Sequence, residues 1–171
     1  AAGTIRDCTA QVEFYNRDSV GLKCFGGIVG YVVRGGIENC TVRSGSVIDD
    51  PVASPAVEYG VGGIAGAMTS DRKVSGTLSY MTGCTVEQGV TVCGSTNAGG
   101  LTGYGTLIDN CRTGASVSLS NADFSASAFA GAPQTVGEEG TSNSYYYGSY
   151  VQGTGNLIKG STTNCHYAFI G

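Results

Sequence analysis

The feature that most constrains the fold is a short glycine-rich element that occurs three times in this chain of 171 residues. Each copy has two glycines, an aliphatic residue, a variable residue and a further glycine. The copies consist of Gly26, Gly27, Ile28 and Gly30, of Gly62, Gly63, Ile64 and Gly66, and of Gly99, Gly100, Leu101 and Gly103. They start 36 and 37 residues apart. Such a period is typical of units that stack because none can bury its own apolar face alone.

A second element recurs between the glycine-rich copies. An aliphatic residue stands three positions before a cysteine, as in Ile5 and Cys8, Ile37 and Cys40, Met81 and Cys84, and Ile108 and Cys111. The residue just before each cysteine is Asp, Asn or Gly, which tolerate the left-handed backbone conformation and are suited to a sharp corner between two strands. Such a bend lets the aliphatic residue and the cysteine both point inward. Ser144 and Cys165, which each follow an Asn, extend the pattern to about six repeats.

Short strands are the only regular structure that the residue pattern favours. Val, Ile, Thr and Tyr dominate the periodic segments, and glycines interrupt every window long enough for a stable helix. The sequence therefore predicts an all-β fold, a parallel β-solenoid (β-helix) of about five to six irregular coils with projecting loops, in a single domain over 1–171. We expect loops at 49–59, 70–79 and 121–144, and an irregular, loop-rich insertion over 114–144.

Five of the seven cysteines share one position of the repeat, namely Cys8, Cys40, Cys84, Cys111 and Cys165. Because free cysteine is among the most buried residue types, we predict a buried ladder of small apolar thiols. Disulfides in an oxidising compartment are the alternative interpretation. No pair of cysteines has the CxxC spacing and the one histidine is His166, so we predict no zinc site.

Composition argues against several classes of partner. With 9 basic residues and a net charge of -4, the chain has no basic stripe that would bind phosphates, so we expect no nucleic acid. No apolar run approaches the roughly 20 residues that span a bilayer, so we expect no membrane insertion. The chain starts within a repeat, and we expect it to be a piece of a longer polypeptide.

Motifs for cofactors and catalysis are weak. Residues 60–65 match the dinucleotide fingerprint GxGxxA, but the glycines recur as the repeat and no helix is expected to follow, so we predict no cofactor. The acidic pairs Asp49–Asp50 and Glu138–Glu139 are sequence neighbours, which diverge on a strand and do not support acid–base catalysis. Calcium binding in these loops stays open.

One outward-facing column is a candidate contact surface. The residues just after the corner position are Thr9, Thr41, Thr85, Arg112, Tyr145 and His166. A second cluster consists of Tyr145, Tyr146, Tyr147 and Tyr150, of which alternation should place half in the core. Exposed tyrosines favour sugar or protein contacts.

The element G-G-[IL]-x-G followed by an aliphatic residue and Asn-Cys resembles the Glug motif repeat of bacterial surface proteins, which is also found near immunoglobulin A peptidases. The resemblance covers Ala1 to about Thr113 and reaches the segments NSYYYG and NCHY. It implies an exported repeat region at the bacterial cell surface, with an adhesion or stalk role and no catalytic residues.

The sequence thus predicts a non-enzymatic extracellular repeat scaffold, an adhesive or structural segment of a bacterial cell-surface protein. Its expected partners are neighbouring domains or subunits of the same protein, and host glycans or proteins. One alternative is a subunit of an extracellular fibre that stacks end to end, since neither end has a polar capping coil. Another is a polysaccharide lyase or glycosidase of the parallel β-helix type, which would need clustered carboxylates or basic residues on one face.

Overall fold

The computed structural model describes residues 3–17, 24–52, 60–69, 79–95, 97–105, 107–120, 126–133, 140–147, 162–163 and 166–167. Every element in these ranges is a β-strand, and none is a helix, as the sequence predicts. The described part accordingly contains no helix that could cross a membrane.

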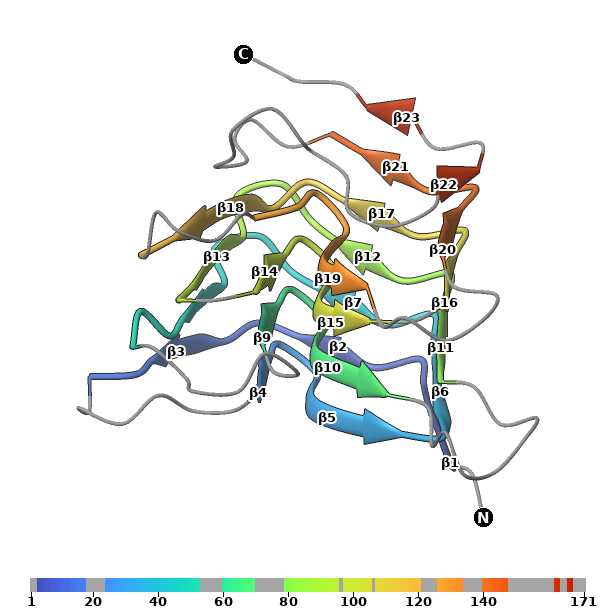
Figure 1. Cartoon of the computed structure of the whole chain (residues 1–171), viewed down its shortest axis with the longest axis horizontal. Coiled ribbons are helices and arrows are strands. Elements are labelled where there is room, and N and C mark those ends of the chain that lie inside the picture. Colours follow the sequence, from blue (N-terminus) through green and yellow to red (C-terminus); the bar gives the residue numbers. More distant parts are fainter. Residues whose placement is uncertain are drawn as a thin grey trace.

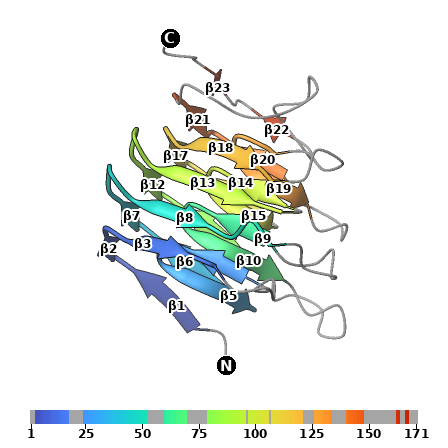
Figure 2. The same cartoon turned by 90° about the vertical axis from the view of Figure 1, so that its left-hand side faces the viewer.

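The strands form five stacks, and the chain visits the stacks in the same order in each coil (Figures 1 and 2). The first stack holds β1 (Gly3–Arg6), β6 (Gly35–Glu38), β11 (Tyr80–Thr82), β16 (Leu107–Asp109), β20 (Gly140–Ser142) and β22 (Thr162–Thr163). The second stack holds β2 (Thr9–Ala10), β7 (Thr41–Val42), β12 (Thr85–Val86), β17 (Arg112–Thr113), β21 (Tyr145–Tyr146) and β23 (His166–Tyr167).

The other three stacks complete each coil. The third holds β3 (Glu13–Tyr15), β8 (Val47–Asp49), β13 (Thr91–Gly94) and β18 (Ser116–Leu119). The fourth holds β4 (Cys24–Gly26), β9 (Gly60–Gly62) and β14 (Ala98–Gly99). The fifth holds β5 (Val29–Val33), β10 (Ala65–Thr69), β15 (Thr102–Gly105) and β19 (Ala130–Pro133).

All strands within a stack are parallel, and equivalent repeat positions are in register. Ile5 pairs with Ile37, Ile37 with Met81, and Met81 with Ile108, one residue from each of the first four coils. β1 and β23 lie at opposite ends of the stack of coils (Figure 2). The fold is therefore the parallel β-solenoid that the sequence predicts, with up to six strands in a stack.

The corner residue has the predicted left-handed backbone in each repeat for which the structure describes it. The φ angles in this column are 56° at Asp7, 54° at Asn39, 65° at Gly83, 49° at Asn110 and 48° at Asn143. The ladder of hydrogen bonds between coils continues through the corner, since the N–H of Asn39 donates to the carbonyl oxygen of Thr82 in the next coil at 3.0 Å. Residues on both sides of the bend can therefore enter the core.

The glycine-rich element is a tight reversal that presses the fourth stack against the fifth. A Cβ atom added at Gly62 would overlap the carbonyl oxygen of Ala65 and the Cα atom of Thr102 in the next coil. At Gly63 a Cβ atom would overlap the carbonyl oxygen of Gly100, again in the next coil. Glycine is required here because the backbone of a neighbouring coil already fills the space.

The aliphatic residue of the glycine-rich element also connects neighbouring coils, because its carbonyl oxygen accepts hydrogen bonds from the preceding coil. The oxygen of Ile64 accepts hydrogen bonds from two consecutive N–H groups of the preceding coil, those of Ile28 at 3.0 Å and Val29 at 3.2 Å. The carbonyl oxygens of Leu101 and Phe129 accept two such bonds in the same way in the next two coils. A carbonyl oxygen has two lone pairs, so one residue can satisfy both donors of the reversal.

The core consists of columns of apolar side chains between the stacks. Ile64 and Leu101 are fully buried, as predicted, whereas Ile28 in the first coil is only partly buried. Further columns place Ile37 and Met81 behind the first stack and Ile48 behind the third, all fully buried. Burial of each such side chain contributes roughly 1.5 to 3 kcal/mol.

The region 114–144 contains more regular structure than the irregular, loop-rich insertion that we predicted. β18, β19 and β20 lie there and join the existing stacks. Ser127 pairs with Gly99, which makes residues 127–131 (SAFAG) a fourth copy of the glycine-rich element with Phe129 at the aliphatic position. The other two loops were predicted at 49–59 and 70–79. Of these, residues 53–59 and 70–78 lie outside the described part of the chain.

The steric role of the glycines can be tested with a matched pair of substitutions. Gly62 has a backbone conformation open to any residue, so Gly62→Ala should act through overlap with the next coil and lower the free energy of unfolding by about 3 kcal/mol or more. A Cβ atom at Gly3 would have nothing within 4 Å, so Gly3→Ala should stay within about 1 kcal/mol of the original protein. Urea denaturation measures both, and equal effects would contradict the steric explanation.

Candidate functional site

The cysteines of the corner form a ladder through the core. Cys40, Cys84 and Cys111 are fully buried, and the N–H of Cys40 donates to the Sγ atom of Cys84 at 3.4 Å. In the next coil Ser144 takes the place of the cysteine, and its Oγ atom accepts from the N–H of Cys111 at 3.1 Å. The ladder therefore needs a small side chain with an acceptor atom. Cys165 lies outside the described residues.

Each ladder thiol also satisfies a carbonyl group at the corner. The Sγ atom of Cys40 donates to the carbonyl oxygen of Glu38 at 3.3 Å, and that of Cys111 to Asp109 at 3.2 Å. Burial raises the pKa of Cys40 to about 11, and a hydrogen bond with the Cys84 thiol together with burial raises the pKa of Cys111 well above its ordinary value. The same hydrogen bond with Cys111 lowers the pKa of Cys84, but the Cys84 side chain is fully buried. Because a reactive cysteine must be both a thiolate and accessible, these thiols are suited to structure rather than to catalysis.

Cys8 differs from the rest of the ladder, because the structure leaves it exposed. It occupies the predicted repeat position and donates to the carbonyl oxygen of Arg6 at 3.3 Å. The reason for its exposure is its place in the first coil, where the described structure has no further coil to cover it. No disulfide joins the six described cysteines.

Cys93 lies outside this ladder, in an outward-facing column of the third stack. Its register partners are Asp49 in the preceding coil and Ser118 in the following one. Burial raises the pKa of Cys93, and a hydrogen bond with Asp49 raises it further. A catalytic cysteine needs a neighbour that stabilises the thiolate, so this arrangement opposes nucleophilic chemistry.

The acidic pair Asp49–Asp50 is engaged in structural contacts. Asp50 is buried and accepts a hydrogen bond from Nδ2 of Asn16 at 2.7 Å, while Asp49 forms an ion pair with Arg17 at 3.0 Å. The described residues contain no group of three or more His, Cys, Asp or Glu side chains that could hold a metal ion. Residues 138–139 lie outside the described part.

The dinucleotide-like stretch 60–65 forms β9, a reversal and the start of β10. In a dinucleotide-binding fold these glycines would lead into a helix whose N-terminus binds the pyrophosphate. Here a strand follows, and the glycines are required by the packing of Gly62 and Gly63 against the next coil.

The predicted outward column of the second stack is present in the structure. Thr9, Thr41, Thr85 and Arg112 are paired in register, and the backbones of Tyr145 and His166 continue the column. Thr9 and Arg112 are exposed, and Thr41 and Thr85 are half-buried. We call this set of side chains, from Thr9 to Arg112, the lateral column.

The tyrosine cluster divides between core and surface. Tyr146 is fully buried, and its hydroxyl donates to the carbonyl oxygen of Ala115 at 3.4 Å. Tyr147 is half-buried, and its hydroxyl donates to the carbonyl oxygen of Val86 at 2.9 Å. These two tyrosines therefore anchor the fifth coil, while Tyr150 lies outside the described residues.

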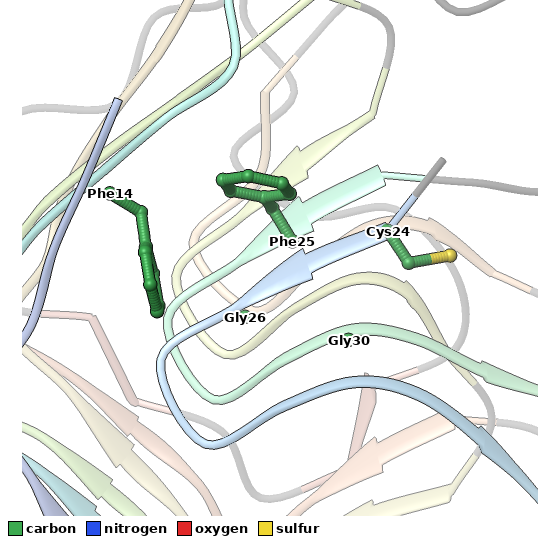
Figure 3. Close-up of a pocket in the computed structure, with 5 residues that line it drawn as sticks. All are labelled: Phe14, Cys24, Phe25, Gly26 and Gly30. Atoms are coloured by element: carbon green, nitrogen blue, oxygen red, sulfur yellow. The ribbon is translucent and has the colours of Figure 1, made fainter. Parts of the chain in front are cut away.

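An apolar hollow in the first coil is a feature that the sequence did not predict. It has a volume of about 210 Å³ and is lined by Phe14, Cys24, Phe25, Gly26 and Gly30 (Figure 3). The two rings meet edge to face with their centroids 5.7 Å apart. The one feature of the sequence that could have indicated this hollow is the size of the two Phe side chains. Both lie in register with smaller residues of the second coil, Phe14 with Ile48 and Phe25 with Val61.

Comparison with known proteins adds no family assignment. No protein-family model matches the chain, and no curated protein or solved structure is significantly similar to it. The Glug resemblance therefore remains a prediction.

Thiol reactivity provides a test of the ladder. At mildly alkaline pH and low protein concentration, Cys8 should react rapidly with iodoacetamide because it is exposed, whereas Cys40, Cys84 and Cys111 should be protected in the folded protein. Peptide mass spectrometry locates the modified residues, with the urea-unfolded protein as the control in which all four react. Rapid modification of Cys84 in the folded protein would contradict a closed ladder.

Proposed function

We propose that this chain is a non-enzymatic extracellular repeat scaffold that serves as a structural or adhesive segment of a bacterial cell-surface protein. The observation that carries the proposal is the unbroken register of the first and second stacks, each of which has six strands. A continuous stack of hydrogen-bonded coils is stiff, and it extends by about 4.8 Å with each added coil. These are the properties of a spacer or a display surface.

The contacts of the polar side chains support a structural role. Tyr80 donates to Oε1 of Glu38 at 2.5 Å, which raises the pKa of Tyr80, and Asn143 donates to Oδ1 of Asp109 at 2.8 Å. Both contacts run from one coil to a neighbouring coil. Acidic side chains thus form hydrogen bonds between neighbouring coils, as Asp50 also does with Asn16.

Within this proposal, the lateral column is the surface for adhesion. Its side chains project from an extended, regular stack, and Arg112 adds a positive charge and a planar donor group to a row of hydroxyls. Hydroxyls and a guanidinium group can hydrogen-bond to sugar hydroxyls or to carboxylates. Host glycans and host proteins are accordingly the ligand classes that fit it.

The proposal is tested by binding and turnover measured together. Beads coated with the protein are incubated with immobilised host glycans and matrix proteins, and the same glycans are analysed for cleavage. We expect retention without any shortening of the glycans, and a loss of retention of about tenfold in Arg112→Glu, since the substitution places a repulsive charge in the lateral column.

The control is Thr91→Glu, which introduces the same side chain at an exposed position of the third stack and should bind like the original protein. Equal retention of the two variants would contradict adhesion through the lateral column. Release of saccharide products by the original protein, abolished in a carboxylate variant, would replace the scaffold with the polysaccharide lyase or glycosidase.

A further inference from the structure

The side chain of Tyr147 lies along the outer face of the second stack. The backbone N–H of Tyr147 donates to the carbonyl oxygen of Thr113 at 2.9 Å, which places Tyr147 opposite Gly114 in the preceding coil. Its hydroxyl reaches one coil further and donates to the carbonyl oxygen of Val86 at 2.9 Å. The ring crosses Gly114 on the way, because a Cβ atom added there would overlap its Cε2 atom. Tyr147 is thus a half-buried aromatic ring that is held at both ends.

A guanidinium group lies beside this ring. Arg112 is exposed, and because it stands two residues before Gly114 on a strand it shares the outward face. Burial raises the pKa of Tyr147, the carboxylate of Glu87 raises it further and the guanidinium of Arg112 lowers it, so both charges act on the ring. Oε2 of Glu87 accepts from the N–H of Ser44, in the coil before, at 2.8 Å. Arg112 itself forms no ion pair within the described ranges. We call Tyr147 and Arg112 the Tyr147 site.

The surroundings of the Tyr147 site suit a sugar better than a protein. The cores of protein interfaces are rich in apolar and aromatic side chains. The other outward side chains that the structure describes on this stack are all polar or charged, namely Thr9, Gln11, Thr41, Arg43, Thr85, Glu87 and Arg112. A sugar ring has an apolar face and an edge of hydroxyls, which match one aromatic ring set among hydrogen-bonding groups.

We propose that the Tyr147 site binds a carboxylated sugar residue of a glycan, with the sugar ring stacked on Tyr147 and its carboxylate paired with Arg112. A guanidinium group matches a carboxylate with two parallel hydrogen bonds. Thr85, the register partner of Arg112 in the preceding coil, adds a hydroxyl next to it. The inference rests on the proposed adhesion through the lateral column, to which Arg112 belongs, and narrows its ligand class to acidic glycans.

Tyr80 on the first stack provides a contrast within the same molecule. Its ring lies over Gly36 of the preceding coil, where an added Cβ atom would overlap it. Its hydroxyl donates to Oε1 of Glu38, so a carboxylate lies next to the ring, and the guanidinium of Arg6 is already paired with Glu38 at 3.8 Å. A carboxylated sugar finds no unpaired guanidinium there, which makes Tyr80 the matched control for Tyr147.

The role of Arg112 is tested by isothermal titration calorimetry with two acidic probes. One is a trisaccharide that ends in sialic acid, and the other is an oligosaccharide of alternating glucuronic acid and N-acetylglucosamine, so that the two sources of a sugar carboxylate are compared. We expect binding of at least one probe, and binding about tenfold weaker after its carboxyl groups are reduced to alcohols. Arg112→Gln should weaken binding of the acidic probe about tenfold and leave binding of the reduced probe unchanged.

The role of the aromatic ring is tested with Tyr147→Phe and Tyr147→Leu. Both variants lose the hydrogen bond to Val86, and Phe alone keeps an aromatic face. Binding of the acidic probe should therefore be about tenfold weaker in Tyr147→Leu than in Tyr147→Phe. Tyr80→Leu should bind like the original protein. Arg112→Gln alters only an exposed side chain, so its comparison holds even where Tyr147→Leu fails to fold by circular dichroism.

Four results would overturn the inference: no binding of either acidic probe, equal affinity for the reduced probe, equal affinity of the Leu and Phe variants, or equally tight binding of a peptide of glutamates. Any of these, found together with the loss of bead retention in Arg112→Glu, leaves adhesion through the lateral column standing and removes only the acidic sugar. Equal bead retention of Arg112→Glu and Thr91→Glu contradicts the adhesion itself, so the two failures are distinguishable.

Discussion

The fold depends on how closely successive coils approach each other at the glycine-rich element. There the backbone of one coil occupies the volume that a side chain of the next would need, as at Gly62 and Gly63. This contact fixes the relative height of the coils, because the carbonyl oxygen of Ile64 must accept two N–H groups from the coil before it. Once that height is fixed, the parallel register of the other stacks and the alignment of the core columns follow.

The corner and the thiol ladder complete the same constraint on the opposite side of the coil. A left-handed residue such as Asn39 turns the chain sharply and leaves a carbonyl group that the following thiol satisfies. Ser144 makes the equivalent inter-coil contact with an oxygen atom, so size and hydrogen bonding, rather than redox chemistry, explain the residue choice. The side chains left for contact with other molecules include those that face outward in the lateral column.

The sequence predicted the solenoid, the corner column and the lateral column because each depends on local spacing that repeats. It did not predict the fourth glycine-rich copy, since Ser127 and Ala128 replace the glycine pair and the interval from the third copy is shorter. The exposure of Cys8 and the hollow beside Phe14 could not be read from repeat positions either. Both arise from position within the stack: the same residue type is core in a middle coil and surface in the first.

Residue-resolved hydrogen exchange of the native protein tests the central claim most directly. The account predicts that the amides of Ile28, Ile64 and Leu101, which all donate to the next coil, exchange slowly and that Ile64 and Leu101 open with nearly the full free energy of unfolding. Exchange of the Ile64 amide at the rate of an unstructured peptide, while the amide of Thr85 stays protected at the corner, would show that the coils are not held together at the glycine-rich element and would contradict the account.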